Sequence, residues 1–491
     1  MTATVLPVRL DHSFARDVPS LSVRWRARPV DLSGARPLVV NDPLAQELGI
    51  DPEWLRGEAG LAFLTGQLPE DAPTYAQAYA GHQFGGYSPQ LGDGRALLLG
   101  EVTGARGRRQ DLHLKGSGAT PFARRGDGRA VVGPMLREYL VGEAMHALGV
   151  PTTRALAVVS TGDLVVRESR QPGAVLCRVA ASHLRVGTFQ YAAAAGDVGA
   201  LRALADHAIA RHHRAAAEED EPYLAFYAAV ARAQASLVAA WMGVGFIHGV
   251  LNTDNVAVSG EGLDYGPCAF MDICDPATVF SSIDRGGRYA YGNQPGVTQW
   301  NLARFGEALL PLIDDRPEAA VESASEVLQA FPGFYREAFT GVMAAKLGVS
   351  PEALAGSTSG GGGFVEDTIS LLTTHRVDFT SFFRALCTGA ARELFDDPGP
   401  YDRWAARRDV LRPGGVDDEQ MRVSMLAANP VYIPRHHRVE EALAAAVEGD
   451  MAPFERLAAA VSYPFEERPD LADLAGPAPA GGPPPVTFCG T

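Results

Sequence analysis

Three side chains between residues 254 and 264 have the types and spacing that metal-dependent transfer chemistry requires. Residues 248–255 read HGVLNTDN, and nine residues after Asn255 comes Asp264, in the string DYG. An amide oxygen and a carboxylate are hard donors of the kind that Mg²⁺ and Mn²⁺ prefer, and we expect these two on facing strands. Asp254, directly before Asn255, adds a carboxylate that could accept a proton from a substrate.

The string HGVLNTDN shares its ends with the protein-kinase loop H-R-D-x-x-x-x-N, in which the aspartate accepts the substrate proton and the asparagine binds a metal. Val250 occupies the aspartate position here. Either the site binds a nucleotide without turning it over, or Asp254 acts as the base for a substrate presented from another direction. Successive side chains of an extended segment point to opposite sides, so Asp254 and Asn255 need not compete for one metal.

Further candidates precede this loop. Residues 92–95 read GDGR, and Lys115 ends the strand-like string DLHLKG, where a kinase-like protein places an ammonium group on nucleotide phosphates. Taken alone, Gly92 and Gly94 indicate only a tight turn, and Lys115 only a solvated strand end. The next helical string offers Glu138 and Glu143 as partners for Lys115, and helical periodicity does not choose between them.

Several arginines accompany the lysine. The loop FARRGDGRA, residues 122–130, is basic and glycine-rich and carries Asp127 and Gly128. Arg178 and Arg185 follow, seven residues apart, in mainly apolar segments where an unpaired guanidinium would be costly. Guanidinium groups form forked hydrogen bonds to phosphate oxygens. The alternative is ordinary surface charge, but the pattern favours a polyphosphate held by side chains.

The elements that must position these residues follow the order of a protein kinase. Short β-rich strings separated by glycines, among them GRALLLGEV, QDLHLKG, ALAVVSTGD, LVVRES and AVLCRVA, are interrupted by one helical string, GPMLREYLVGEAMHALG, and followed by alanine-rich helices. We therefore expect an α+β, protein-kinase-like bilobal fold. Its parts are an N-terminal extension (1–75), a β-rich small lobe (76–190), a helical large lobe (191–340), a C-terminal helical region (341–475) and a flexible tail (476–491).

The composition fits a soluble, folded protein. Hydrophobic residues make up 46% and charged residues 21% of the 491 residues, and the formal net charge of -15 gives no support for a nucleic-acid or anionic-membrane partner. The N-terminus lacks the apolar region of a secretory signal, and no run of about 20 apolar residues occurs. Five cysteines show no CxxC spacing. We expect a cytoplasmic protein, most simply a monomer.

Long strings of this sequence resemble one known family. YAGHQFGGYSPQLGDGRALLLGE, KGSGATPFARRGDGRAVVGPMLREYL, HGVLNTDN, DYGPCAFMD, GRYAYGNQP and the ending FCGT together are similar to the protein adenylyltransferase SelO family. The resemblance implies a kinase-like enzyme that binds ATP in a flipped orientation. Such an enzyme buries the γ-phosphate and transfers AMP to Ser, Thr or Tyr hydroxyls of target proteins.

The resemblance also implies roles for single residues. Asp254 would accept the proton, Asn255 and Asp264 would bind magnesium or manganese, and Glu138 would pair with Lys115. The nucleotide would contact Gly92, Gly94, Arg95, Lys115, Asp127, Gly128, Arg178, Arg185 and Asp264. Some members carry selenocysteine where this chain has Cys489. A disulfide from Cys489 to Cys268 or Cys274 is a further hypothesis.

Two other functions fit parts of the pattern. A non-catalytic, nucleotide-binding pseudokinase would act through its partners. A small-molecule kinase of the aminoglycoside type has a loop that begins H-G-D, and Val250 in place of that aspartate counts against it. The sequence carries no signature of the target proteins and does not choose between ATP and UTP.

Overall fold

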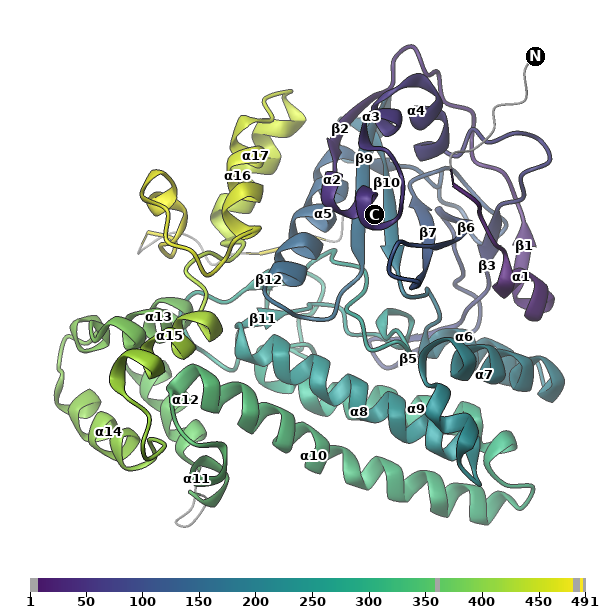
Figure 1. The fold of residues 1–491 in the computed structure, drawn as a ribbon. Helices are drawn as coiled ribbons and strands as arrows, with labels where there is room; N and C mark the ends of the chain where they lie inside the picture. Colours follow the sequence, from purple (N-terminus) through teal and green to yellow (C-terminus); the bar gives the residue numbers. More distant parts are fainter. Residues whose placement is uncertain (1–7, 358–362, 480–485, 489–491) are drawn as a thin grey trace.

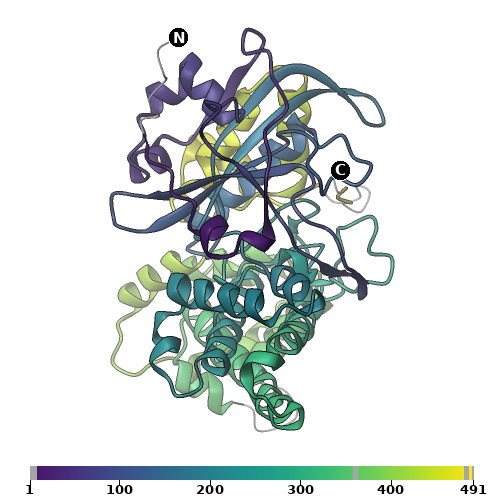
Figure 2. The same cartoon turned by 90° about the vertical axis from the view of Figure 1, so that its right-hand side faces the viewer.

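The structure is a computed structural model, which describes residues 8–357, 363–479 and 486–488. It is a mixed α/β protein built on an antiparallel sheet (Figure 1). The strands gather at one end of the molecule and the longest helices at the other (Figure 2). The expected order of a sheet, one helix, more sheet and then helices is therefore present.

The main sheet has eight strands in the order β1-β3-β6-β7-β10-β9-β2, with β8 paired to β10. Their bounds are β1 Ser22–Arg24, β2 Arg36–Val40, β3 Tyr75–Gln77, β6 Ala96–Thr103, β7 Arg109–Lys115, β8 Ala130–Val131, β9 Arg154–Val166 and β10 Arg170–Ala180. The strings ALAVVSTGD and LVVRES, expected as separate strands, form the single strand β9. Strands β1 and β2 come from the first 75 residues, so the sheet extends across the boundary expected there.

Helix α5 (Val132–Ala147) packs on the sheet beside β9 and β10. Pro134 lies in its first turn, and Gly149, with φ of +76°, follows its end, which are the positions where proline and glycine are favoured. The outer face of α5 is covered by α16 (His436–Val447) and α17 (Ala452–Val461), which share one hydrophobic cluster with it. Helix α5 is thus held between the sheet and the C-terminal helices.

The helical end of the molecule surrounds the largest hydrophobic cluster. The principal helices there are α6 Val186–Ala194, α7 Val198–His212, α8 Pro222–Gly243, α9 Gln294–Ile313, α10 Pro317–Leu347, α12 Phe364–Thr374, α13 Phe379–Thr388, α14 Gly399–Val410 and α15 Asp418–Ala428. Helix α8 is long and apolar enough to cross a membrane by length and composition, but it packs along α9 and α10, with Phe226, Val230 and Trp241 buried.

The shorter elements complete the chain. Helices α1 Ser13–Asp17, α2 Asp42–Glu47, α3 Pro52–Arg56 and α4 Glu58–Leu64 belong to the N-terminal part, and α11 Pro351–Gly356 follows α10. Two small antiparallel pairs, β4 Gly81–Gln83 with β5 Gly86–Ser88 and β11 Phe246–Ile247 with β12 Ala269–Phe270, flank the loops that carry the candidate chemistry.

Candidate active site

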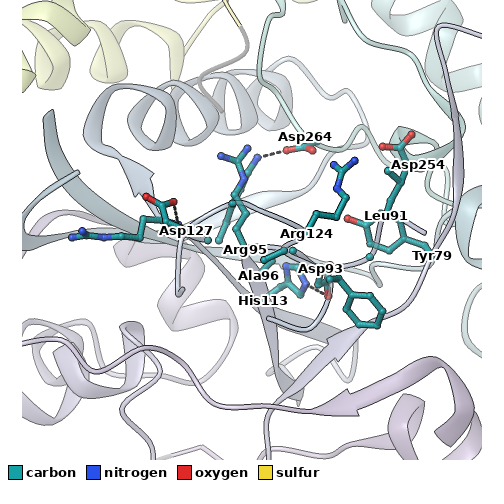
Figure 3. Close-up of a pocket in the computed structure, with 18 of the residues that line it drawn as sticks. Tyr79, Leu91, Asp93, Arg95, Ala96, His113, Arg124, Asp127, Asp254 and Asp264 are labelled. Carbon is teal, nitrogen blue, oxygen red and sulfur yellow. Dashed lines mark hydrogen bonds and ion pairs between the residues drawn. The ribbon is translucent and has the colours of Figure 1, made fainter. Parts of the chain in front are cut away.

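A cavity of about 290 Å³ collects most of the residues that the sequence singles out (Figure 3). Its lining includes Gly92, Gly94, Arg95, Lys115, Asp127, Gly128, Arg178, Arg185, Asp254 and Asp264. Glu138 and Asn255 are not part of the lining. Each of two loops, residues 92–95 and 122–130, gives only a weak indication of function when taken alone. In the structure both face the same cavity as the loop after β11.

The glycines of these loops permit close approaches between backbone segments. Gly92 has φ of +69°, and a Cβ atom there would lie 2.3 Å from the Phe122 ring. Gly94 would place a Cβ atom 3.0 Å from the carbonyl oxygen of Phe122, and Gly128, with φ of +68°, 2.1 Å from the backbone nitrogen of Ala119. A side chain at Gly92 would therefore push the two loops apart, and one at Gly128 would push the 122–130 loop away from Gly118 and Ala119.

Lys115, at the end of β7, forms a buried ion pair with helix α5. Its Nζ atom lies 2.6 Å from Oε2 of Glu138, and Nε of Arg178 lies 2.9 Å from Oε1 of the same carboxylate. Glu143 instead binds Arg154 through both of its oxygens. The structure therefore joins Glu138, and not Glu143, to Lys115, which is the choice that helical periodicity left open.

Arg178, on β10, has unfilled hydrogen-bonding capacity. Its side chain is only 3% exposed, and within the described part of the chain its Nη1 atom has no hydrogen-bond partner. A buried guanidinium N–H without an acceptor is costly, so such groups in native proteins usually meet a partner, a water or a ligand. Because Arg178 lines the cavity, an anionic ligand there would supply the missing acceptor.

Asp264 lies opposite Lys115 with a left-handed backbone, φ +71°. One carboxylate oxygen contacts the ammonium of Lys115 and lies 3.7 Å from Nη2 of Arg178. Burial opposes ionisation of Asp264, but these two cations hold its pKa well below the usual range. Asp264 is therefore an anion, the form in which a carboxylate binds a metal.

Asp254 is buried beside the cavity and incompletely hydrogen-bonded. Gln83 Nε2 donates to its Oδ2 at 3.1 Å, and among the described residues Oδ1 has no hydrogen-bond partner. Burial raises the pKa of Asp254 to about 6, although the Gln83 hydrogen bond and Arg185 act in the opposite direction. A Cβ atom on Gly81 would lie 2.7 Å from Oδ1, so hairpin β4–β5 closes over the carboxylate.

Asn255 and Asp264 do not lie on facing strands, and that expectation is wrong. Asn255 ends a short 3-10 helix, Thr253–Asn255, and Asp264 lies in an irregular loop. The strands that face each other are β11 and β12, which flank both loops and bring them to one end of the pair. Asp254 and Asn255 are also not extended, so their side chains diverge through the 3-10 turn.

The side chain of Asn255 donates a hydrogen bond from its Nδ2 atom to the carbonyl oxygen of Val250 at 2.9 Å. This bond orients the side-chain amide by its nitrogen. The oxygen is the atom with which an asparagine binds a metal, and Asp264 would supply a carboxylate oxygen. Within the described residues no group of three or more His, Cys, Asp or Glu side chains could form a closed metal cage.

Arg185, the residue before α6, lies under the cavity. Its guanidinium stacks 4.3 Å from the centre of the Tyr79 ring, donates to the backbone oxygen of Asp254 at 3.4 Å and lies 4.0 Å from Asp93. Asp93 in turn accepts a hydrogen bond from the His113 ring at 3.0 Å. Arg185 is therefore fixed from several sides, and it adjoins the backbone of the loop that carries Asp254.

Asp127 lies at the outer side of the cavity and is already ion-paired. Both of its oxygens bind the guanidinium of Arg167, at 2.9 and 3.0 Å, and its Oδ1 also accepts from the backbone of Arg129. These contacts lower its pKa. Asp127 holds its loop to the β9–β10 hairpin and still borders the cavity.

Sequence reasoning missed several lining residues, among them Tyr79, Gln83, Asp93 and His113. Asp93 is the second residue of GDGR, so the motif includes it, but no motif assigns it a partner 20 residues away in β7. Gln83 is an ordinary amide in a glycine-rich string. Its contact with Asp254 joins residues 171 positions apart, which no local pattern reveals.

The cysteine hypothesis is not tested by the geometry. Cys489 lies outside the described residues, whereas Cys268 and Cys274 are buried. Burial raises the pKa of both thiols to about 12, so neither is a reactive thiolate in this conformation. The described part of the tail does reach this region, because Thr487 Oγ1 donates to the carbonyl oxygen of Pro267 at 2.7 Å.

Comparison with known proteins gives one consistent answer. Residues 30–462 match the family model described as protein adenylyltransferase SelO. A protein nucleotidyltransferase YdiU of Mycolicibacterium paratuberculosis is 55% identical over 495 residues, covering 99% of this chain and 98% of the relative. The proteins of the same name from Cereibacter sphaeroides and Pseudarthrobacter chlorophenolicus are each 56% identical, over 98% and 99% of this chain and 99% and 98% of theirs.

Proposed function

This chain belongs to the protein adenylyltransferase SelO family, and from that premise we propose that it transfers AMP from ATP to Ser, Thr or Tyr hydroxyls of proteins and releases pyrophosphate. The proposal includes a protein-kinase-like bilobal arrangement. The antiparallel sheet with α5 is the small lobe, helices α6 to α10 form the large lobe, and the cavity lies between them.

The observation that carries this proposal is the buried cationic floor of the cavity. Lys115 and Arg178 are 5% and 3% exposed, yet together they face only the carboxylates of Glu138 and Asp264, and Nη1 of Arg178 is unpartnered among the described residues. Arg185 adds a third buried cation. A terminal phosphate would satisfy this floor, since phosphate oxygens accept forked hydrogen bonds from guanidinium groups.

With the γ-phosphate on this floor, the nucleotide is reversed relative to an ordinary kinase. The α-phosphate then faces the side of the cavity that Asp254 borders, and the adenosine extends outward. This orientation gives a reason for Val250 in the position of the usual kinase base. A base at that position would serve an acceptor that attacks the γ-phosphorus. None is needed there, because the phosphorus under attack is that of the α-phosphate.

Asp254 acts as the general base for the acceptor hydroxyl. Its partnerless Oδ1 can take the proton, and a pKa of about 6 leaves the carboxylate ionised at neutral pH while keeping it basic enough to help. The hydroxyl oxygen forms a bond to the α-phosphorus, the bond between the α-phosphorus and the bridging oxygen breaks, and pyrophosphate leaves. Lys115 and Arg178 stabilise the charge on the departing group.

A divalent metal fits the donors present. Asp264 is ionised, Asn255 offers an amide oxygen, and Mg²⁺ is commonly held by one or two protein oxygens together with phosphate oxygens and waters. Asn255 and Asp264 would hold magnesium, or manganese, which when bound neutralises phosphate charge. Gly92, Gly94, Arg95, Asp127 and Gly128 complete the nucleotide site, and the Glu138 ion pair holds Lys115 in place.

The remaining properties follow from charge and surface. The net charge of -15 favours protein acceptors over nucleic acid, and helix α8 is accounted for as a core helix. We propose a cytoplasmic monomer without a membrane partner. The division of the chain at residues 75, 190, 340 and 475 stays part of the same proposal, with β1 and β2 added to the small lobe and helices α6 and α10 counted whole in the large lobe.

Position-specific labelling of ATP tests the function. With ATP labelled at the α-phosphate the enzyme is expected to label protein, and with ATP labelled at the γ-phosphate it is expected to leave protein unlabelled. Label from the γ-phosphate would identify a kinase, and nucleotide binding with neither label transferred would identify a scaffold. Asp264→Ala should abolish α-label transfer, whereas Asp314→Ala, which removes a partly exposed carboxylate outside the cavity lining, should not.

A further inference from the structure

The turn of residues 123–126 holds an arginine in a conformation that normally favours glycine. Arg124 has φ of +54°, and the backbone nitrogen of Gly126 donates to the carbonyl oxygen of Ala123 at 2.8 Å, which closes a four-residue turn with Arg124 as its second residue. Turns with a positive φ at the second position strongly favour glycine there. A non-glycine residue held in such a conformation is an observation that often marks a functional site.

This turn is anchored tightly to the glycine loop. The Oγ1 atom of Thr120 donates to the carbonyl oxygen of Asp93 at 2.6 Å and accepts from the backbone nitrogen of Phe122 at 3.1 Å. The Phe122 side chain is 6% exposed and packs against Gly92. The position of Arg124 relative to the nucleotide site is therefore set by the fold, although its side chain is exposed.

Arg124 differs in its charge environment from the other cations of the cavity. Five of them lie within 4.0 Å of a carboxylate: Lys115, Arg129, Arg167, Arg178 and Arg185. For Arg124, no ion pair or hydrogen bond of the side chain occurs with any residue in the described ranges. It lines the cavity together with Asp254 and Asp264 (Figure 3). A guanidinium of this kind can bind an anion without giving up an internal partner.

We infer that Arg124 is a catalytic residue that binds the non-bridging oxygens of the α-phosphate during AMP transfer. This inference rests on the proposed function. The buried cations occupy the floor, where the terminal phosphate lies, whereas exposed Arg124 stands at the mouth, where the α-phosphate meets the acceptor hydroxyl. Negative charge grows on those oxygens as the new bond forms, and a guanidinium fork stabilises it most at that moment.

The test compares three variants in steady-state α-label transfer and in thermal unfolding. Arg124→Gly removes the guanidinium and relieves the backbone. Its kcat is expected to fall about 100-fold, as for loss of one transition-state donor, with the KM for ATP within about threefold of wild type and no loss of melting temperature. Arg124→Lys should recover part of the lost kcat. Arg125→Gly removes the same side chain one position along, outside the cavity lining, and should transfer like wild type.

Several results would overturn the inference. Wild-type transfer by Arg124→Gly would show that the arginine is only surface charge, and a raised KM with unchanged kcat would place it on the ground-state nucleotide instead. A melting temperature well below wild type would contradict the view that the turn prefers glycine. Each of these leaves the proposed function standing, whereas failure of the wild-type enzyme to transfer α-label removes the proposed function itself.

Discussion

At the scale of single residues, the central feature is a carboxylate kept short of hydrogen bonds. Asp254 is 8% exposed, has one side-chain donor, Gln83, and keeps Oδ1 without a partner among the described residues. A buried, underbonded carboxylate is costly for folding, and useful for proton transfer, because its pKa approaches the working pH. At this one position, the burial that raises the pKa of the carboxylate also lowers the stability of the fold.

The pH dependence of transfer should report Asp254 directly. Only the ionised carboxylate accepts a proton, so kcat/KM is expected to fall as the pH drops below about 6. The Gln83 hydrogen bond lowers the pKa of Asp254, so Gln83→Leu should move the acid limb to higher pH. The pH–rate profiles of wild type and Gln83→Leu measure this shift. An acid limb at the same pH in both proteins would show that Gln83 does not affect the pKa of the catalytic base.

Asp254→Asn should abolish transfer and stabilise the protein. The folded-state pKa is raised from 3.8 to about 6, so ionisation in the fold is unfavourable, and this destabilisation is absent below pH 3.8 and complete above pH 6. A shift of this size corresponds to at most about 3 kcal/mol. Denaturant unfolding at pH 8 should show a gain for the variant that shrinks towards pH 4, and a loss at pH 8 would contradict it.

The sequence predicts the individual chemical groups better than their environment. Lys115, Asp254 and Asp264 are recognisable because motif and spacing mark them, and they line one cavity. The choice of Glu138 over Glu143 required the packing of α5 on β9 and β10. Asp93 and His113 carry no local signal, because their pairing depends on the loop before β6 folding against β7.

At the scale of elements, two close contacts decide whether the nucleotide loops can meet. Gly92 packs on Phe122, and hairpin β4–β5 packs on the 3-10 turn of Asp254, where His82 donates its backbone N–H to Thr253 Oγ1 at 2.6 Å. Such contacts depend on the absence of a side chain at Gly92 and Gly81. The glycine-rich strings therefore shape the cavity as well as turning the chain.

A pair of glycine variants separates close approach from backbone conformation. Gly92→Ala would place a Cβ atom 2.3 Å from the Phe122 ring, whereas Gly107→Ala, at a similar φ of +72°, would meet no atom within 4 Å. Both variants incur the left-handed cost of about 1 kcal/mol. Only Gly92→Ala is expected to raise the KM for ATP strongly, in a transfer assay, and equal effects would refute the steric account.

The elements that the sequence misjudged are those whose ends depend on distant partners. Gly162 and Asp163 look like a turn, yet β9 continues through them, because β10 pairs with β9 on both sides, at Ser160 and at Leu164, with a register shift between the two. The backbone of Gly34, from the N-terminal part, also packs closely against Gly162. The alternation of apolar residues identifies strands, but sheet partners decide where a strand ends.

At the scale of the whole molecule, a buried arginine binds the C-terminal region to β12 and the segment that follows it. Arg435 is fully buried, and its guanidinium binds Asp378 at 2.7 and 2.9 Å and Asp272 at 2.6 Å. Its backbone also bridges to Phe270 of β12. The ion cluster therefore fixes the segment after β12 against the start of α16, which packs on α5.

Arg435→Met should destabilise the protein strongly. Removing one partner of a buried ion pair leaves its carboxylates uncompensated, which costs about 3–5 kcal/mol. Arg438→Met removes an exposed pair with Glu441 and should cost at most about 1 kcal/mol. Chemical denaturation of both variants measures the difference, and similar values would show that the cluster does not tie the regions together.

The most direct measurement of the central claim is the structure of the enzyme with a non-hydrolysable ATP analogue and Mg²⁺. The proposal predicts the terminal phosphate against Lys115 and Arg178, the metal at Asn255 and Asp264, and the α-phosphorus on the side of Asp254. Adenine in the interior, with the terminal phosphate directed to the mouth of the cavity, would contradict it.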